Sequence, residues 1–361
     1  MKLKTNSLMQ RRRFIKTTLL TGTFLKFSPQ LFHIISRPKL NAEVIGHGDF
    51  KYRVEKNWGD LDPKKTPVNN CHEMVQSADG RLFLLTDHPK NNIIIYDKSG
   101  KLLGSWTLNY AGAHGLSIHR EGGDEYLYIT DTGAGKVTKT TLEGKIVLDL
   151  KSPNKMGAYE PNAFYRPTET AIGPNGDIYV ADGYGSQFIV QYSSKGEFIQ
   201  KFGGDSFLQK NKFKQAHGVA LDTRDLRNPT LLCSARIKNT FKRFSLEGEF
   251  IEDIYLPGAF ISRPVIDGEN LYSGVCFGMT KENYNMQMNL GFVTILDKNN
   301  QVVSNPGGTK PKYKKDGKLE MMTQDKPVFK HCHDVCVDSD KNLYVCQWNA
   351  DKVYPYKLHR V

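Results

Sequence analysis

Helical periodicity is absent from most of this sequence. After residue 40, no segment places apolar residues at the three- and four-residue intervals of an amphipathic helix. This absence argues against an α/β protein of two domains, because its crossover helices would carry that pattern. A chain of 361 residues can still bury a substantial core, so one large repeat architecture is the favoured interpretation.

A disulfide framework is also lacking, since the six cysteines have no familiar spacing. Cys332 and Cys336 would lie about 13 Å apart on one strand, too far to bond with each other. Cys71 and Cys332 each precede a histidine of a recurring motif and could become neighbours. We favour small buried thiols over a disulfide there.

A basic arm of the kind that binds nucleic acid is missing too, although the net charge is +12. Residues 1–40 contain nine lysines and arginines and no acidic residue. Removing these nine leaves about +3 for the rest of the chain, which has no basic segment beside a row of aromatic residues. We therefore expect no nucleic-acid partner.

The positive charge belongs to a leader. Residues 11–16 read Arg-Arg-Arg-Phe-Ile-Lys, which is the twin-arginine pattern. Lys26 interrupts the weakly apolar stretch 17–35, which is too short and too polar for a comfortable membrane span, and no Ala-x-Ala cleavage site stands out. A basic tail before an ordinary helix is the alternative. We expect residues 1–40 to engage the twin-arginine export machinery and the folded protein to be periplasmic or extracellular.

A short motif that begins with histidine recurs along the chain, at His72, His114, His217 and His333. Each histidine opens a run with the character of a β-strand, and three of the four runs lead through a turn to an apolar strand. Ten histidines in 361 residues would place about 0.17 of a histidine in six such positions by chance. One location in the fold therefore favours imidazole.

The motif is part of a longer repeat. Six units are recognisable, at about 71–107, 112–150, 164–203, 213–256, 259–308 and 329–361. Their short strands and Gly-containing turns at similar positions are typical of propeller blades. The last unit lacks an outer strand, which the alternating segment 51–58 can supply, closing the ring. We predict an all-β, six-bladed β-propeller over residues 51–361 and expect a monomer.

Three of the histidines are suitably placed to bind a metal ion. His114, His217 and His333 fall on blades two, four and six, and alternate blades of six are related by about a third of a turn. Three imidazoles that leave one position open are typical of catalytic Zn²⁺. Histidines that only line a wet channel are the alternative. His72, on blade one, could be an extra ligand, an acid–base group or a packed residue.

A second cation site is predicted deeper in the channel. Asp334 follows His333 and points to the opposite face of its strand, so both cannot bind one ion from the same side. Its carboxylate and the carbonyls of Met74 and Leu116 could hold a hard cation such as Ca²⁺. Alternatively, the aspartate only satisfies a turn.

Residues 178–192 read Ile-Tyr-Val-Ala-Asp-Gly-Tyr-Gly-Ser-Gln-Phe-Ile-Val-Gln-Tyr. This segment, the alternate-blade histidines and the pair His333 and Asp334 resemble peptidyl-α-hydroxyglycine α-amidating lyase, an NHL-type six-bladed propeller. The resemblance covers about residues 51–361. It implies a catalytic Zn²⁺, a structural Ca²⁺ and the cleavage of a carbinolamide into an amide and glyoxylate. It also implies that Tyr184 takes the proton of the substrate hydroxyl and that Arg236 steadies developing charge or a carboxylate.

The chain departs from the family at two positions. The second arginine of the family, on blade one, falls here in residues 86–90, where His88 or Lys90 could replace it. The cysteine expected after Tyr184 is Gly185, so the disulfide that braces that loop is absent. We expect a small-molecule or peptide substrate. The alternatives are a calcium-dependent lactonase or hydrolase and a non-enzymatic NHL propeller that binds a protein or glycan.

Overall fold

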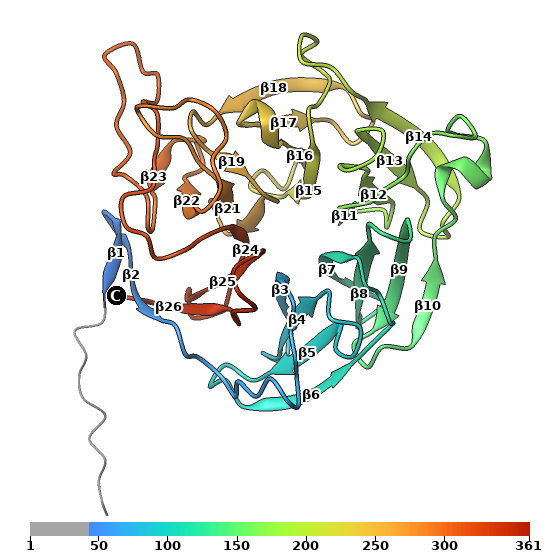
Figure 1. The fold of residues 1–361 in the computed structure, drawn as a ribbon. Helices are drawn as coiled ribbons and strands as arrows, with labels where there is room; N and C mark the ends of the chain where they lie inside the picture. Colours follow the sequence, from blue (N-terminus) through green and yellow to red (C-terminus); the bar gives the residue numbers. More distant parts are fainter. Residues whose placement is uncertain (1–42) are drawn as a thin grey trace, which may run out of the picture. The chain divides into compact units, whose positions relative to one another are not determined.

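A computed structural model describes residues 43–361, which form six antiparallel sheets (Figure 1). The predicted leader, with its twin-arginine pattern at residues 11–16, lies outside the described residues. Among residues 43–361, no helix is long and apolar enough to cross a membrane.

The first three blades each contain four strands. Blade one comprises β3 (Cys71–Gln76), β4 (Leu82–Thr86), β5 (Ile93–Tyr96) and β6 (Leu102–Trp106). Blade two comprises β7 (Ala113–Glu121), β8 (Asp124–Asp131), β9 (Lys136–Thr141) and β10 (Ile146–Asp149). Blade three comprises β11 (Glu169–Ile172), β12 (Ile178–Ala181), β13 (Phe188–Tyr192) and β14 (Phe198–Gly203).

The remaining blades are less uniform. Blade four comprises β15 (Ala216–Asp222), β16 (Thr230–Ala235), β17 (Thr240–Phe244) and β18 (Phe250–Tyr255). Blade five comprises β19 (Phe260–Ile261), β20 (Val265–Asp267), β21 (Asn270–Phe277), β22 (Phe292–Leu296) and β23 (Val302–Ser304). Blade six comprises β24 (Cys332–Val337), β25 (Leu343–Gln347), β26 (Tyr356–Arg360), β2 (Phe50–Glu55) and β1 (Val44–His47). Two short 3-10 helices cover Pro153–Met156 and Arg236–Lys238.

The predicted six-bladed propeller is confirmed, and so is its closure by an N-terminal strand. In Figure 1, β2 (blue) lies beside β26 (red), and Tyr52 is paired with Arg360. The closing strand spans residues 50–55 rather than 51–58 and brings a partner that we did not predict, β1. Trp58 leaves the sheet and packs on Tyr96 and Tyr344, with ring centroids 5.3 and 4.7 Å away.

Burial explains why the inner and middle strands are uninterrupted apolar runs. All five residues of β4 and all four of β5 are buried, because adjacent blades cover both faces of each sheet. The outermost strand β6 instead alternates between half-buried and exposed positions. The six cysteines are free and buried, which confirms the prediction of buried thiols.

The inner edge of blade five is broken. Its inner strand is divided into β19 and β20, with Ser262, Arg263 and Pro264 between them. Pro264 has no N–H to donate to a ladder, which favours an interruption at this point. The break leaves Arg263 at the channel, where it contacts other blades.

Candidate metal centre in the central channel

Four histidines occupy equivalent positions at the channel. His72 lies on β3, His114 on β7, His217 on β15 and His333 on β24, each at the inner edge of its blade. At all four, the inner strand carries one extra residue relative to its neighbour, so the ladder is interrupted by a bulge. Bulges redirect side chains. Here the bulged residues turn their imidazoles toward the channel.

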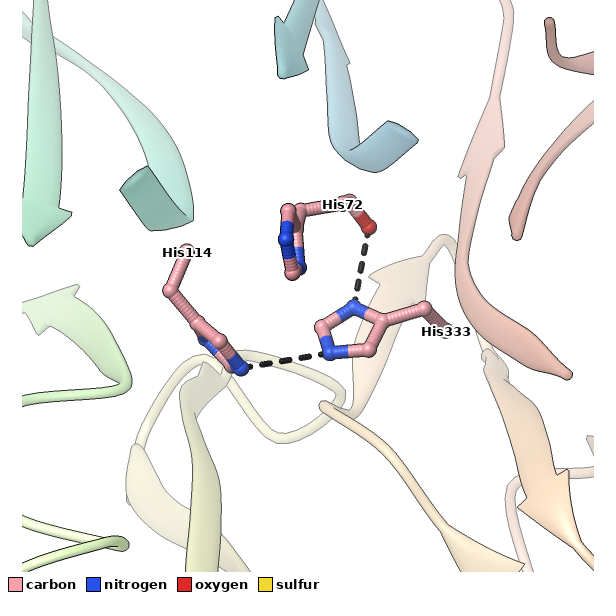
Figure 2. A group of neighbouring side chains, drawn as sticks. All are labelled: His72, His114 and His333. Carbon is pink, nitrogen blue, oxygen red and sulfur yellow. Dashed lines mark hydrogen bonds between the residues drawn. The ribbon is translucent and has the colours of Figure 1, made fainter. Parts of the chain in front are cut away.

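The four imidazoles converge on one region. The ring centroid of His114 lies 4.7 Å from that of His333, 4.8 Å from that of His217 and 5.0 Å from that of His72. All four residues are between 1% and 5% exposed. Figure 2 shows three of them, from three blades, pointing toward one another.

Hydrogen bonds fix two of the rings in the form that binds a metal. Nδ1 of His114 donates to the Thr168 carbonyl at 2.9 Å, and Nδ1 of His333 donates to the His72 carbonyl at 3.0 Å. In neutral rings, both Nε2 atoms then carry lone pairs, although they lie only 3.2 Å apart (Figure 2). Two lone pairs that face each other without a shared proton suit a cation, and a backbone partner on the other nitrogen is usual for a metal-binding histidine.

Burial keeps these rings neutral. Desolvation lowers the pKa of His114, His217 and His333 well below the usual value, and the positive charge of Arg236 lowers it further. Because only neutral imidazole binds metal, the low pKa values keep the site competent over a wide pH range.

The third ligand has two candidates. Donor atoms of His72, His114 and His333 lie within 4.8 Å of one another. The predicted set has His217 in place of His72, and Nε2 of His217 lies 3.0 Å from the Tyr184 hydroxyl. Nδ1 of His72 and Nδ1 of His217 are both buried without a hydrogen-bond partner. His72 Nε2 also lies 3.4 Å from Oδ2 of Asp87, so one of the two ring nitrogens of His72 already has a partner.

Tyr184 and Arg236 lie beside the histidines. The Tyr184 hydroxyl is 3.2 Å from His114 Nε2 as well as 3.0 Å from His217 Nε2. Arg236 is 1% exposed and donates from Nε to the Ile261 carbonyl and from Nη2 to Ser262 Oγ. Burial raises the pKa of Tyr184, and this effect outweighs the opposing charge of Arg236. An arginine alone therefore does not produce the lowered pKa that a base would need.

Tyr184 and Arg236 line a cavity of about 430 Å³. Its lining includes His72, Asp87, His114, Tyr184, Arg236, Phe277 and Trp348. Phe277 and Trp348 form an apolar side with ring centroids 6.2 Å apart. The cavity can thus accept a small polar group next to the histidines and an apolar group beside it.

A second arginine at the site was not predicted. Arg166 donates from Nε to the Thr132 carbonyl, and its guanidinium carbon is 5.9 Å from the centre of the Tyr184 ring. It comes from blade three, whereas the residues that could replace the family's second arginine were His88 or Lys90 of blade one. His88 instead accepts a hydrogen bond from the Lys90 backbone N–H. Arg166 lies two residues before Thr168, which is the blade-three residue equivalent to the four histidines. This position was the available signal.

A carboxylate braces the loop that lacks a disulfide. Asp182 accepts hydrogen bonds from the backbone N–H groups of Arg166 and Ser186, both at 2.7 Å, and from the Tyr159 hydroxyl at 3.0 Å. These bonds join the segment before β11 to the loop between β12 and β13, which carries Tyr184. A Cβ on Gly185 would lie 2.1 Å from Asp182 Oδ1, so a cysteine cannot occupy that position unless the loop shifts.

The oxygen atoms predicted to hold calcium meet a different cation. Asp334 and the carbonyls of Met74 and Leu116 do converge, but on the guanidinium of Arg263. Nε of Arg263 is 2.7 Å from Asp334 Oδ1, and Nη1 is 2.7 Å from the Leu116 carbonyl. A calcium ion would need the same oxygens at 2.3–2.6 Å, so it does not fit beside this side chain.

The repeated blades and their ring define the class of protein, a six-bladed β-propeller of the NHL-repeat kind. No protein-family model matches the chain. It is 26% identical over 351 residues to peptidyl-alpha-hydroxyglycine alpha-amidating lyase 1 of Drosophila melanogaster, a match that covers 90% of this chain and 56% of the relative. The chain thus spans just over half the length of that relative.

Two further similarities agree with the class. Human NHL repeat-containing protein 3 is 27% identical over 182 residues, which cover 48% of this chain and 51% of that protein. A solved gluconolactonase from Xanthomonas campestris superposes with a TM-score of 0.55 at 12% identity, over 86% of this chain and 90% of the other. At that identity the superposition shows the fold alone.

Proposed function

We propose that this protein is a zinc-dependent lyase that cleaves a carbinolamide, or a closely related N-substituted hydroxy compound, into an amide and glyoxylate. The observation that carries the proposal is the Tyr184 hydroxyl, which lies within hydrogen-bond distance of Nε2 of both His114 and His217. Tyr184 lines one cavity together with His114 and the buried Arg236. The similarity to the Drosophila lyase over 90% of this chain supports it.

His114, His217 and His333 are the residues we propose to hold the zinc. Neutral imidazoles from alternate blades, two of them anchored through Nδ1, form a donor set that suits this ion. When bound, Zn²⁺ would acidify the substrate hydroxyl and lower the pKa of a neighbouring phenol. His72 is directed toward Asp87, so we do not propose it as a ligand.

The side chains of the cavity supply the rest of the chemistry. Tyr184 would accept the proton of the hydroxyl as the carbon–oxygen double bond forms and the C–N bond breaks. The departing amide nitrogen needs one proton, the same number that the hydroxyl loses, so the reaction requires no oxidant or reductant. Arg236 is buried at this point and would stabilise negative charge there, where low dielectric strengthens its effect.

Arg166 would supply the second positive group for a substrate carboxylate. It is exposed, and it contacts two residues that line the cavity: it donates to the Thr132 carbonyl, and its guanidinium lies over the Tyr184 ring. A planar guanidinium can bind a carboxylate through two parallel hydrogen bonds. We propose that it takes the place of the arginine that blade one lacks.

The test combines metal analysis with a glyoxylate assay. The wild-type protein should hold about one zinc-like ion per chain after dialysis and release glyoxylate from an α-hydroxyglycine peptide. The double variant His114→Ala, His217→Ala should lose both the ion and the activity. If neither sample contains a transition metal, the enzyme proposal fails and a binding propeller remains.

A further inference from the structure

The channel has a second tier directly below the histidines. It is formed by the residues that directly follow the four histidines, and the equivalent residues of blades three and five. These residues differ in charge from blade to blade. From blade one to blade six these residues are Glu73, Gly115, Glu169, Gly218, Arg263 and Asp334. Three are acidic, two are glycine and one is a cation, contributed by the broken strand of blade five. All four charged members are buried, at 8% exposure or less.

Arg263 binds three strands of the ring at once. Its guanidinium pairs with both oxygens of Asp334, from Nε at 2.7 Å and from Nη2 at 3.0 Å. Nη1 donates to the Leu116 carbonyl at 2.7 Å, and Nη2 donates to the Met74 carbonyl at 3.1 Å. These partners lie on β24, β7 and β3, one or two residues after His333, His114 and His72.

The two glutamates complete an acidic cage. Oε2 of Glu73 lies 3.5 Å from Nη1 of Arg263, and Oε2 of Glu169 lies 3.9 Å away. Glu73 also accepts a hydrogen bond from the Leu116 backbone N–H. Burial raises the pKa of both glutamates, and the guanidinium opposes that rise. One cation therefore faces three carboxyl groups and two carbonyls.

The neighbouring strands leave room for this side chain. A Cβ on Gly218 would lie 2.5 Å from the Cα of Arg263, so only glycine lets blade four approach so closely. The Asp334 carboxylate also accepts a hydrogen bond from the Met74 backbone N–H at 3.1 Å, which connects blade six to blade one. The packing of blades four, six and one around Arg263 thus matches the guanidinium.

We propose that Arg263 is a built-in replacement for a structural calcium ion, so that the protein closes its ring and positions its histidines without Ca²⁺. Carboxylates and carbonyls gathered around one point are the ligands that Ca²⁺ prefers. A guanidinium matches them with five N–H donors in a plane and cannot be lost to a chelator. Arg263 is a positioning residue, and its role does not depend on which reaction the histidines support.

The experiment compares the wild type with Arg263→Ala and Arg263→Lys, each prepared in calcium-free buffer. Calcium content is measured after gel filtration, and Tm is measured with and without added CaCl₂, with MgCl₂ as the matched control. The wild type should retain no calcium, and its Tm should not respond to either salt. Arg263→Ala should have a lower Tm that CaCl₂ raises and MgCl₂ does not, because the cage then lacks its cation. Arg263→Lys, which keeps a charge, should not respond to calcium.

Several results would overturn the proposal. One calcium ion per chain in the wild type, or a wild-type Tm that rises with CaCl₂, shows that Arg263 does not replace the ion. A soluble Arg263→Ala variant that neither loses stability nor gains a calcium response shows that the cage is not built around a cation. If that variant does not fold, the wild-type and Arg263→Lys measurements decide. Zinc content and glyoxylate release are separate readouts, so failure of the lyase proposal would leave this result unaffected.

Discussion

Replacing Tyr184 with phenylalanine tests the proposed lyase with the smallest change, because it removes one oxygen and keeps the ring. The hydroxyl has a single proton, so it can donate to only one of its two neighbours, His217 Nε2 at 3.0 Å or His114 Nε2 at 3.2 Å. Loss of one hydrogen bond reduces the free energy of unfolding by about 1 kcal/mol. Loss of a general base reduces the rate by about 10²–10⁴-fold, which corresponds to about 3–5 kcal/mol in the activation free energy.

The two effects differ enough to be separated. The assay is glyoxylate release from an α-hydroxyglycine peptide, with zinc content and Tm measured on the same preparation. Tyr179→Phe is the matched control, because Tyr179 is a tyrosine of the same blade that loses the same atom but donates to the Leu246 carbonyl, in a contact between blades three and four. Tyr184→Phe should keep its zinc and most of its stability while turnover falls at least a hundredfold. Turnover within about threefold of the Tyr179→Phe control, with zinc fully retained, would refute the assignment of Tyr184 as the base.

The remaining predictions concern the metal, pH and the Tyr184 loop. If His217 is a ligand and His72 is not, His217→Ala should lose zinc on dialysis while His72→Ala keeps it, and the reverse pattern would favour His72. Burial lowers the folded-state pKa of three histidines below the unfolded value of about 6.5, so the unfolded chain takes up more protons at acid pH. Each such histidine should thus cost the metal-free protein about 1.4 kcal/mol per pH unit below about pH 6.5. Because the raised pKa of the buried Glu73 and Glu169 offsets part of this loss, the test compares urea unfolding of the wild type and His114→Ala at several pH values; identical pH profiles would contradict the prediction. Asp182→Ala leaves three hydrogen-bond donors without their acceptor and should reduce the free energy of unfolding by about 3 kcal/mol; unchanged urea unfolding would show that the loop is braced in another way.

The repeats made the ring predictable from the sequence. Blades one to five each form from a local segment with its own turns, so their strands need no long-range inference. The closing strand was found because blade six lacked an outer strand. The histidines were found because the repeat gave them equivalent positions. The bulges that direct the histidines toward the channel could not be predicted, because a bulge depends on the registers of two strands.

Arg263 and Arg166 show what the repeat could not reveal. Arg263 lies in the irregular blade five, and its partners include two backbone carbonyls from blades one and two, which have no sequence signature. The oxygens of the predicted calcium site were identified, but the cation between them depends on a side chain from a distant segment. Arg166 was visible in the sequence, but its approach to Tyr184 depends on how two loops of blade three fold together.

The joining of β2 to β26 has a consequence for how the molecule is made. Arg360 donates to the Tyr52 hydroxyl across 308 positions of the chain, so this contact cannot form until residue 360 has been synthesised. His333 belongs to the same late sheet, whereas His72, His114 and His217 are synthesised much earlier. A nascent chain therefore presents an incomplete set of imidazoles, and a chain truncated before β24 lacks His333 together with the last blade. The four-histidine cluster and the closed ring are therefore completed by the same blade, so a folded cluster would report that blade six is in place.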